Sequence, residues 1–578
     1  MKQRHQSYIV FLFLSIVLLL TKYATFSTYN GADDLHYALL GSKALTHGYN
    51  PFLPYDGYAG RIIPILWQAL WFKVFGINDL TIQLPSLTAL ILLSYVICFK
   101  GGIPEKPVFV ALTAALVYFN PVVFTSTLGN MPDVYVALIA CLIFLIIKKN
   151  MGSRSLTSDI LAGISVGMLL TIGLWVKETI VFVYVSTLIT LVVFRKGMHT
   201  SFLTAIAITV IAGCASWALL YYAETGDVFF RYKQLVHTAY FNACSYERLP
   251  AAVSLRRLTI MMPVVFSQSG FFPVLFTGVF LFYRTSKRKG NTPTIRFYHI
   301  SFVVILLTAL YFPLSIKPFV PLCHENRQFL FVLPLAVLLY MTALDGVCHS
   351  GKKDRQLFFG VSSALLLLSV IINCLTALYN KWIMVDESLL AICFATMVIA
   401  DGKYVWICTG IVIPILLWMS VAYPLYRAPH GGYSDLKDMQ RSIGKDRSLP
   451  KDFYYFTDHD TQMHYEAADK FNASAEYISL DTTDPGLIPF RQYQPEEMFS
   501  NDSAFRPGWM VINPDYTPMY PAQLDAIYAL LKHLEIQKGD VRAYRLSSAV
   551  QLQAILGIVN HVKPLQQSPC GCAPRGPK

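Results

Sequence analysis

The sequence predicts an α-helical polytopic membrane protein with a small α/β domain at its C-terminal end. Three observations predict this fold class. The 578 residues are 54% hydrophobic and only 14% charged, whereas a water-soluble domain of ordinary composition carries about twice that charge. Apolar stretches long enough to cross a hydrocarbon core of roughly 30 Å recur through the first three quarters of the chain. The composition after residue 426 is that of a soluble protein.

We expect about thirteen transmembrane helices from a scan for such stretches. The twelfth is short, and without it the tail would lie on the other side of the membrane. The expected spans are Tyr8–Phe26, Thr81–Cys98, Val108–Ser126, Asp133–Ile147, Ile160–Val176, Thr179–Phe194, Phe202–Tyr222, Thr259–Tyr283, Ile300–Ile316, Phe329–Leu344, Leu357–Leu378, Leu389–Ala400 and Val405–Tyr423.

Positive charge is concentrated in alternate connections between these stretches. Lys2 and Arg4 precede the first stretch, Lys148 and Lys149 follow the fourth, and five cations lie between residues 284 and 296. The positive-inside rule makes these connections cytoplasmic. The net charge of +12 therefore reports topology, and it gives no reason to expect a nucleic-acid partner.

The chain divides into a membrane body, residues 1–426, and a soluble tail, residues 427–578. The body has a long first outer loop at 27–79. Within it, Ile62–Phe75 is aromatic and interrupted by Pro64 and Lys73, which favours a helix lying in the membrane interface. The tail is expected on the outer face, with a disordered C-terminal end.

Short strands and helices are expected in the tail. The strands are Asp452–Thr457, Trp509–Asn513 and Val541–Leu546, and the helices are Thr461–Phe471 and Ala522–His533. The triplet Asp458-His459-Asp460 offers metal ligands, but a strand end followed by a helix cap explains it better. We therefore expect a docking or acceptor-facing module without a catalytic role, and we leave the participation of a divalent metal open.

Acidic residues occur where apolar stretches meet the outer face. Asp33-Asp34-Leu35-His36-Tyr37 opens the first outer loop, and Asp133 begins the fourth apolar stretch. If the first segment is helical, the two aspartates point in different directions, and Asp33 shares a face with Tyr37. Helix capping explains each position separately. Their common side and depth instead favour chemistry at this interface.

Three cations are expected on the same outer side, away from the cytoplasmic loops. Lys177 lies in a tight turn between two apolar stretches, Arg61 in the first outer loop, and Arg327 just before the tenth stretch. Each could be an ordinary interfacial side chain. Together they could hold an anion, because a guanidinium presents a fork that suits phosphate oxygens.

The order of these motifs resembles that of the GT-C membrane glycosyltransferases, in particular the branch of the protein O-mannosyltransferases and the lipid A aminoarabinose transferases. Asp33-Asp34-x-x-Tyr37 is similar to the family's acidic pair and Tyr after the first helix. Further similar segments are His47-Gly48-Tyr49-Asn50-Pro51-Phe52, Phe75-Gly76, Ile82-Gln83-Leu84-Pro85-Ser86, the Gly-rich stretch from Leu161-Ala162-Gly163 to Lys177, and Arg327-Gln328-Phe329-Leu330 with Pro334. Arg61-Ile62-Ile63 replaces the Lys-Pro-Pro of the aminoarabinose transferases, which favours a less specified relative. The resemblance covers roughly residues 1–425.

The resemblance implies an inverting glycosyltransferase that moves a hexosyl or pentosyl group from a polyprenyl-phosphate donor to a lipid, glycan or protein acceptor. It implies catalysis on the non-cytoplasmic face, with a bacterial inner membrane favoured over the endoplasmic reticulum. A carboxylate acts as general base; our hypothesis is Asp33, with Asp34 the alternative. Asp133 and Tyr37, and Asp34 if it is not the base, orient acceptor or sugar. The donor phosphate is held by Arg61, Lys177 and Arg327.

Two other classes of function compete with this one. A polytopic transporter or lipid flippase would place ionisable residues near mid-bilayer and repeat broken helices in related halves; the ionisable residues here gather at one interface, and no internal repeat is evident. A non-catalytic scaffold that presents the tail would tolerate changes such as Asp33→Asn.

Overall fold

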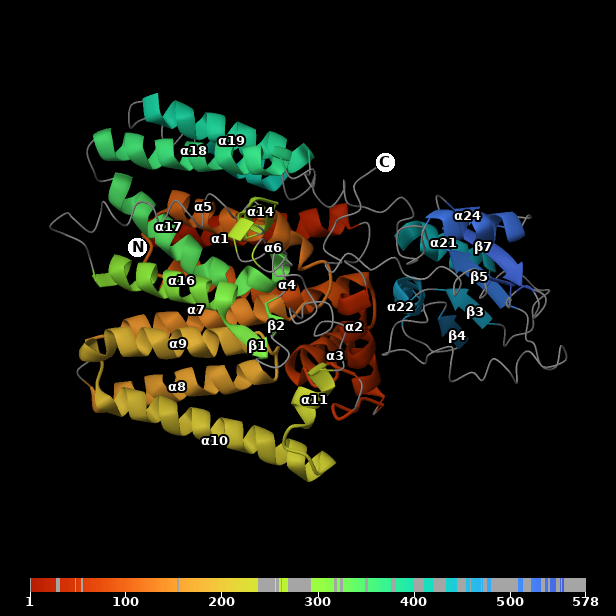
Figure 1. The fold of residues 1–578 in the computed structure, drawn as a ribbon. Helices are drawn as coiled ribbons and strands as arrows, with labels where there is room; N and C mark the ends of the chain where they lie inside the picture. Colours follow the sequence, from red (N-terminus) through yellow and green to blue (C-terminus); the bar gives the residue numbers. More distant parts are fainter. Residues whose placement is uncertain are drawn as a thin grey trace.

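The protein is an integral membrane protein with several passes. Eight helices among the described residues are long and apolar enough to cross a membrane, and they form one bundle (Figure 1). This confirms the α-helical fold class, whereas the expected number of about thirteen spans stays a prediction. The computed structural model describes residues 2–26, 32–46, 48–53, 56–152, 155–236, 262–268, 293–315, 320–322, 326–348, 352–375, 381–399, 410–418, 433–443, 454–457, 459–468, 476–479, 508–512, 521–531, 536–538 and 541–546, with a few isolated residues besides.

Long helices make up most of the membrane body, and shorter ones accompany them. The long helices are α1 (Lys2–Thr25), α4 (Asp79–Lys100), α7 (Asp133–Asn150), α8 (Leu156–Leu174), α9 (Ile180–Phe194), α10 (Thr200–Thr225), α16 (Pro293–Tyr311), α17 (Leu333–Cys348), α18 (Lys352–Leu375) and α19 (Lys381–Ile399). The shorter helices are α2 (Ala32–Leu45), α3 (Ile62–Phe75), α5 (Pro107–Tyr118), α6 (Pro121–Thr125), α11 (Phe230–Val236) and α14 (Met262–Gln268). A strand pair, β1 (Pro313–Ser315) and β2 (Val320–Pro321), follows α16.

Proline explains a break in one predicted span. The stretch Val108–Ser126 forms two helices, α5 and α6, instead of one. The side chain of Asn120 caps α6 by accepting hydrogen bonds from the first backbone N–H groups of that helix, and Pro121 occupies its first position, where a missing N–H costs nothing. The residues after this break carry part of the candidate site.

Two other predicted spans begin at the wrong residue. The span predicted from Phe329 begins earlier, as the 3-10 helix η3 (Asn326–Val332) that leads into α17. The span predicted from Leu389 is part of α19, which begins at Lys381 and pairs with α18 (Figure 1). A hydropathy scan excludes charged residues, so it placed the start of this helix after its two acids.

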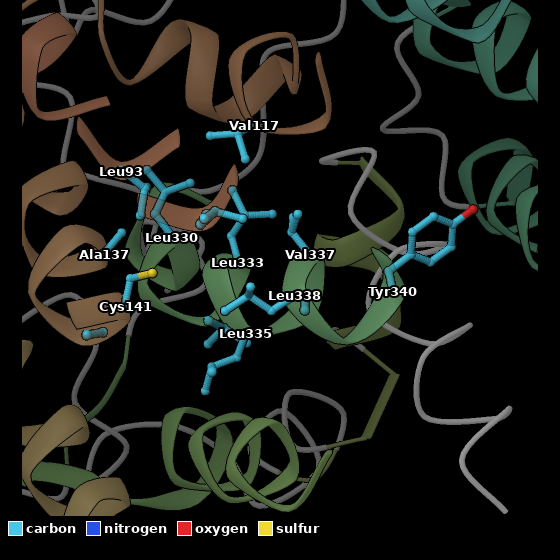
Figure 2. Close-up of a cluster of buried hydrophobic side chains, with 14 of the residues drawn as sticks. Leu93, Val117, Ala137, Cys141, Leu330, Leu333, Leu335, Val337, Leu338 and Tyr340 are labelled. Carbon is cyan, nitrogen blue, oxygen red and sulfur yellow. The ribbon is translucent and has the colours of Figure 1, made fainter. Parts of the chain in front are cut away.

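Helix α17 is buried in the centre of the bundle. Figure 2 shows Leu333, Leu335 and Leu338 of α17 among side chains of other helices, including Leu93 of α4, Val117 of α5 and Ala137 of α7. A helix that is apolar all round is stable only when neighbours cover every side. Because η3 is continuous with α17, this packing fixes the position of Arg327 at the start of η3.

A small mixed sheet forms the tail. Its strands are β3 (Tyr454–Thr457), β4 (Glu476–Ser479), β5 (Gly508–Ile512), β6 (Ile536–Lys538) and β7 (Val541–Leu546), in the order β4-β3-β5-β7-β6. Strand β3 pairs in parallel with β4 and β5, and β7 is antiparallel to β5 and β6. Three helices accompany the sheet: α21 (Tyr433–Ile443), α22 (His459–Ala468) and α24 (Pro521–Leu530). A small α/β tail is thereby confirmed; α21, β4 and β6 were not predicted.

The tail contacts the first outer loop. Met463 and Ala467 of α22 pack against Leu35 and Ala38 of α2, and the ammonium of Lys437 lies 2.6 Å from a carboxylate oxygen of Asp79. Asp458, the side chains of the next two residues, His47, residues 323–325, most of the span predicted at Thr259–Tyr283 and the C-terminal end from residue 556 lie outside the described residues.

Candidate active site

Asp33 begins the site, in the first turn of α2. Its Oδ2 atom accepts a hydrogen bond of 2.6 Å from Nη2 of Arg327, a residue 294 positions later in the chain. Its Oδ1 atom accepts one of 2.5 Å from the hydroxyl of Tyr58. The side chain of Asp33 is 35% exposed and that of Arg327 is 26% exposed, so the pair is accessible from outside.

These partners keep Asp33 ionised. Burial alone would raise the pKa of the Asp33 carboxyl. The positive charge of Arg327 and the hydrogen bond from Tyr58 outweigh burial and hold that pKa below its ordinary value. The first turn of a helix also favours negative charge, because the unpaired N–H groups point toward it.

A tight turn in the first outer loop positions Tyr58. Asp56 accepts backbone hydrogen bonds from Tyr58 at 2.8 Å and Ala59 at 3.1 Å, and its other oxygen lies 3.2 Å from Nε2 of His36. An aspartate that binds the N–H two residues on holds a turn without any regular secondary structure. The turn is thereby tied to α2, one helical turn from Asp33.

A second cluster joins the first outer loop to the turn after α8. The Glu178 carboxylate forms ion pairs with two arginines. Nη2 of Arg61 lies 2.9 Å from Oε2 of Glu178, and Arg231 of α11 contacts the other oxygen. Arg61 also donates to the hydroxyl of Tyr37. Burial would raise the pKa of Glu178, but the two arginines lower it to about 2. One carboxylate therefore serves two guanidinium groups.

Arg231 also joins α11 to the first outer loop. It donates to the backbone carbonyl of Gly57 at 2.8 Å and to Gln234 at 2.9 Å, and its guanidinium packs against Gly60. A β-carbon at Gly60 would stand 2.5 Å from a guanidinium nitrogen, so a larger residue there would displace the end of the Arg231 side chain. The contact holds the loop that carries Tyr58.

Asp133 and Lys177 form a buried ion pair. The ammonium of Lys177 donates to Oδ1 of Asp133 at 2.6 Å, with 10% and 3% of the two side chains exposed. Oδ2 of Asp133 is buried and has no hydrogen-bond partner among the residues that the structure describes. An oxygen in that position can accept a hydrogen bond from a ligand, because an unmet buried acceptor is costly.

Asp34 differs from its neighbour in exposure. Its side chain is fully buried, its Oδ1 accepts from the N–H of Leu35 at 3.0 Å, and its carboxyl group packs against Gly129. A β-carbon at Gly129 would lie 2.4 Å from Oδ2 of Asp34, so only glycine fits there. This packing couples α2 to the loop before Asp133, which Asn130 fixes by donating to the carbonyl of Pro64 at 2.9 Å.

Of the three predicted cations, Lys177 lies close enough to Arg61 and Arg327 to be repelled by both. Burial lowers the pKa of Lys177; Asp133 opposes this effect, and the positive charges of Arg61 and Arg327 add to it. Repulsion of this kind is relieved when an anion binds between the cations. Arg61, Lys177 and Arg327 come from three distant parts of the chain and meet at the end of the bundle that carries α2.

All seven residues predicted for the site belong to this region. Asp33 pairs with Arg327, Tyr37 with Arg61, and Asp133 with Lys177, and Asp34 lies beside Gly129. Sequence reasoning missed Tyr58 and Arg231. The one available signal was an arginine on the side of the membrane that the charge pattern predicts to be outer, the same signal that identified Arg61. No group of three or more potential metal ligands occurs among the described residues.

The solved structures of one protein, ArnT, have a similar fold over nearly the whole chain. ArnT from Cupriavidus metallidurans bound to undecaprenyl phosphate superposes with a TM-score of 0.60 at 12% sequence identity, over 93% of this chain and 97% of that one. The apo state of the same protein gives a TM-score of 0.60 at 12% identity, over 93% and 98%. The apo oligosaccharyltransferase from Archaeoglobus fulgidus gives 0.45 at 11% identity, over 87% and 69%.

No protein-family model matches the chain, and no curated protein does. The two superpositions at a TM-score of 0.60 extend over nearly the whole of both chains, and at this identity they establish the fold. The chain has the GT-C fold of membrane glycosyltransferases, as the order of its motifs predicts.

Proposed function

We propose that the protein is an inverting glycosyltransferase that takes a sugar from a polyprenyl-phosphate donor. The observation that carries this proposal is a partly exposed carboxylate, Asp33, beside three cations, of which Lys177 is repelled by the other two. The carboxylate can take a proton while the cations receive a phosphate, and transfer from a lipid phosphate needs both. The fold match to ArnT, whose structure holds undecaprenyl phosphate, supports the same donor class.

The reaction is a single displacement. The hydroxyl of the acceptor gives its proton to the Asp33 carboxylate as its oxygen attacks the anomeric carbon. The bond between that carbon and the phosphate oxygen breaks, and the polyprenyl phosphate leaves with the electron pair. Attack opposite the leaving group inverts the anomeric configuration. Arg327, Arg61 and Lys177 stabilise the charge that grows on the phosphate.

Arg327 connects the two halves of this step. In the described structure it binds Asp33 at 2.6 Å. When the donor phosphate binds, Arg327 turns toward it, and the loss of the ion pair makes Asp33 a stronger base. Arg61 can turn in the same way, because Arg231 still neutralises Glu178. Binding of the donor therefore makes Asp33 basic enough to take the proton of the acceptor.

The remaining residues orient the reactants. The Oδ2 atom of Asp133, which has no partner among the described residues, accepts a hydrogen bond from the sugar or the acceptor, and the hydroxyl of Tyr37 donates one. Asp34 is buried against Gly129, so we assign it the support of α2 and assign the base to Asp33. We propose that the site lies on the outer, non-cytoplasmic face and that the protein resides in a bacterial inner membrane. We propose an acceptor-facing role for the tail from residue 427.

Reconstitution with a defined donor tests the proposal. The purified full chain is supplied with a panel of polyprenyl-phosphate hexoses and pentoses and with membrane lipid, glycan or peptide acceptors, and the products are identified by mass. We expect one donor to yield a glycosylated acceptor and an equal amount of polyprenyl phosphate. Movement of a lipid-linked sugar across the bilayer without cleavage would contradict the proposal and favour a flippase.

A further inference from the structure

A cavity lies in the wall of the bundle, away from the outer site. Its volume is about 430 Å³, and it lies between α19 and the helix at residues 410–418. Its lining includes Leu389 of α19 and Ile411, Pro414, Ile415 and Trp418 of the second helix. Among the lining side chains, Asp386 is the exception to this apolar character.

Asp386 differs from its neighbour Glu387 in its contacts. Glu387 accepts hydrogen bonds from Ser369 at 2.7 Å and Asn373 at 3.2 Å, both on α18. Asp386 is fully buried, and neither of its oxygens meets a donor in the part of the chain that the structure describes. A carboxyl group without a hydrogen-bond donor in apolar surroundings stays neutral or pairs with a cation.

The cavity opens toward the lipid. Leu389, Ile411 and Trp418 are each between 44% and 51% exposed, so its mouth is on the outside of the helix bundle. Asp386 lies five residues after the start of α19, about 7.5 Å along the helix axis. With Lys352 and Lys353 of α18 in the cytoplasm, that start is on the outer side. Trp418 also lines the cavity, and indole rings favour the region of the lipid head groups.

We propose that this cavity binds the primary ammonium head group of a membrane aminolipid. The ammonium donates hydrogen bonds to both oxygens of Asp386 and neutralises its charge. The ring face of Trp418 attracts the same cation, and the acyl chains lie along Leu389 and Ile411. A phosphatidylglycerol head group lacks the cation. A quaternary ammonium has the charge but no N–H to donate.

Lipid binding to the purified full chain tests this proposal. The protein is mixed with phosphatidylethanolamine, phosphatidylcholine or phosphatidylglycerol that carry identical acyl chains, and the affinity for each lipid is measured from the intact complexes by mass spectrometry. We expect phosphatidylethanolamine to bind at least tenfold more tightly than the other two, and Asp386→Asn to lose at least tenfold of that affinity. Equal binding of the three lipids, or wild-type affinity in Asp386→Asn, would overturn it.

A second variant tests the cavity without removing the carboxyl group. No atom of the described residues lies within 4 Å of a β-carbon built at Gly410 or at Gly346, so both positions accept a larger side chain. Gly410→Leu fills the cavity and is expected to abolish selective binding, while Gly346→Leu on α17 is expected to leave it unchanged. Selective binding that survives Gly410→Leu would place the lipid elsewhere and refute the assignment.

Discussion

The carboxylates of two regions differ in their partners. One region is the candidate active site, which we propose to lie on the outer face and call the outer site, and the other is the cavity in the bundle wall. In the outer site, Asp33, Asp133 and Glu178 each meet a cation that lies 294, 44 and 117 residues away in the chain. In the cavity, Asp386 meets no donor among the described residues. Among the described residues, cations surround the carboxylates of the outer site, and no cation pairs with Asp386 in the cavity.

This difference indicates which ligand each region accepts. A buried charge is tolerated only with a partner, so a protein that supplies several cations to a few carboxylates is prepared for an added anion. A lone carboxylate in an apolar cavity is prepared for a cation. We therefore assign a phosphate to the outer site and an ammonium to the cavity, and the following variants test each half.

Among the variants that change a cation, Arg327→Gln gives the largest effect, because it removes a cation from the phosphate and the partner from Asp33. We expect the turnover of a polyprenyl-phosphate donor to fall by about 10²–10³, the loss that follows removal of one group that stabilises a growing oxyanion. The measurement is product formed per unit of folded protein. Arg195→Gln, at an exposed arginine after α9, is the matched control, and equal activity in both variants would contradict the role of Arg327.

Breaking the buried pair of Asp133 and Lys177 comes next. Lys177→Met leaves Asp133 buried without a cation, and we expect a loss of stability of about 3–5 kcal/mol together with loss of transfer. The double variant Asp133→Asn, Lys177→Met carries no unpaired charge, so it should recover much of the thermal stability without recovering activity. Recovery of both would show that the pair is only structural.

The pH dependence sharpens the assignment of Asp33. Its folded pKa is below the ordinary value of about 3.9 because of Arg327 and Tyr58. The ion pair therefore contributes stability above that pH and loses it only as the pH falls through the lower, folded value. In the pH profile of kcat/KM for the donor, which reports the free enzyme before Arg327 turns to the phosphate, we expect no acid limb above about pH 5 in the wild type. The Arg327→Gln variant should show an acid limb at higher pH than the wild type. Identical pH profiles of the two proteins would mean that the protonation of Asp33 does not control the rate.

Contact between the tail and the first outer loop has the smallest expected effect. Lys437→Glu places two negative charges together at Asp79, and we expect activity to fall about two- to threefold, as for an exposed ion pair worth less than 1 kcal/mol. Adding Asp79→Lys restores the opposite charges and should restore the rate. A double variant as slow as the single one would mean that this contact does not position α2.

The convergence at the outer site could be predicted, but its finer geometry could not. Topology placed Asp33, Asp133 and three cations on one side of the membrane, because charge patterns along a membrane chain report sidedness. The hydrogen bond from Tyr58 and the clamp of Arg231 depend on turns and on close approach to Gly60. No periodic pattern in the sequence encodes either contact.

The cavity was missed because hydropathy ends a span at charged residues. The scan began the twelfth span at Leu389, so Asp386 was assigned to a loop, whereas α19 begins at Lys381 and carries Asp386 inside the bundle. The break at Asn120 was missed for the opposite reason: the residues on both sides are apolar, and the hydropathy remained high across the proline.

Transfer by two neighbouring variants tests the central assignment most directly. Asp33→Asn and Asp34→Asn have the same chemistry and lie one residue apart, but Asp33 is partly exposed beside the cations and Asp34 is buried against Gly129. In a single turnover of the donor, normalised to folded protein, we predict that Asp33→Asn loses about 10²–10⁴ in rate and Asp34→Asn loses less. An Asp33→Asn variant that transfers sugar at the wild-type rate would contradict the assignment.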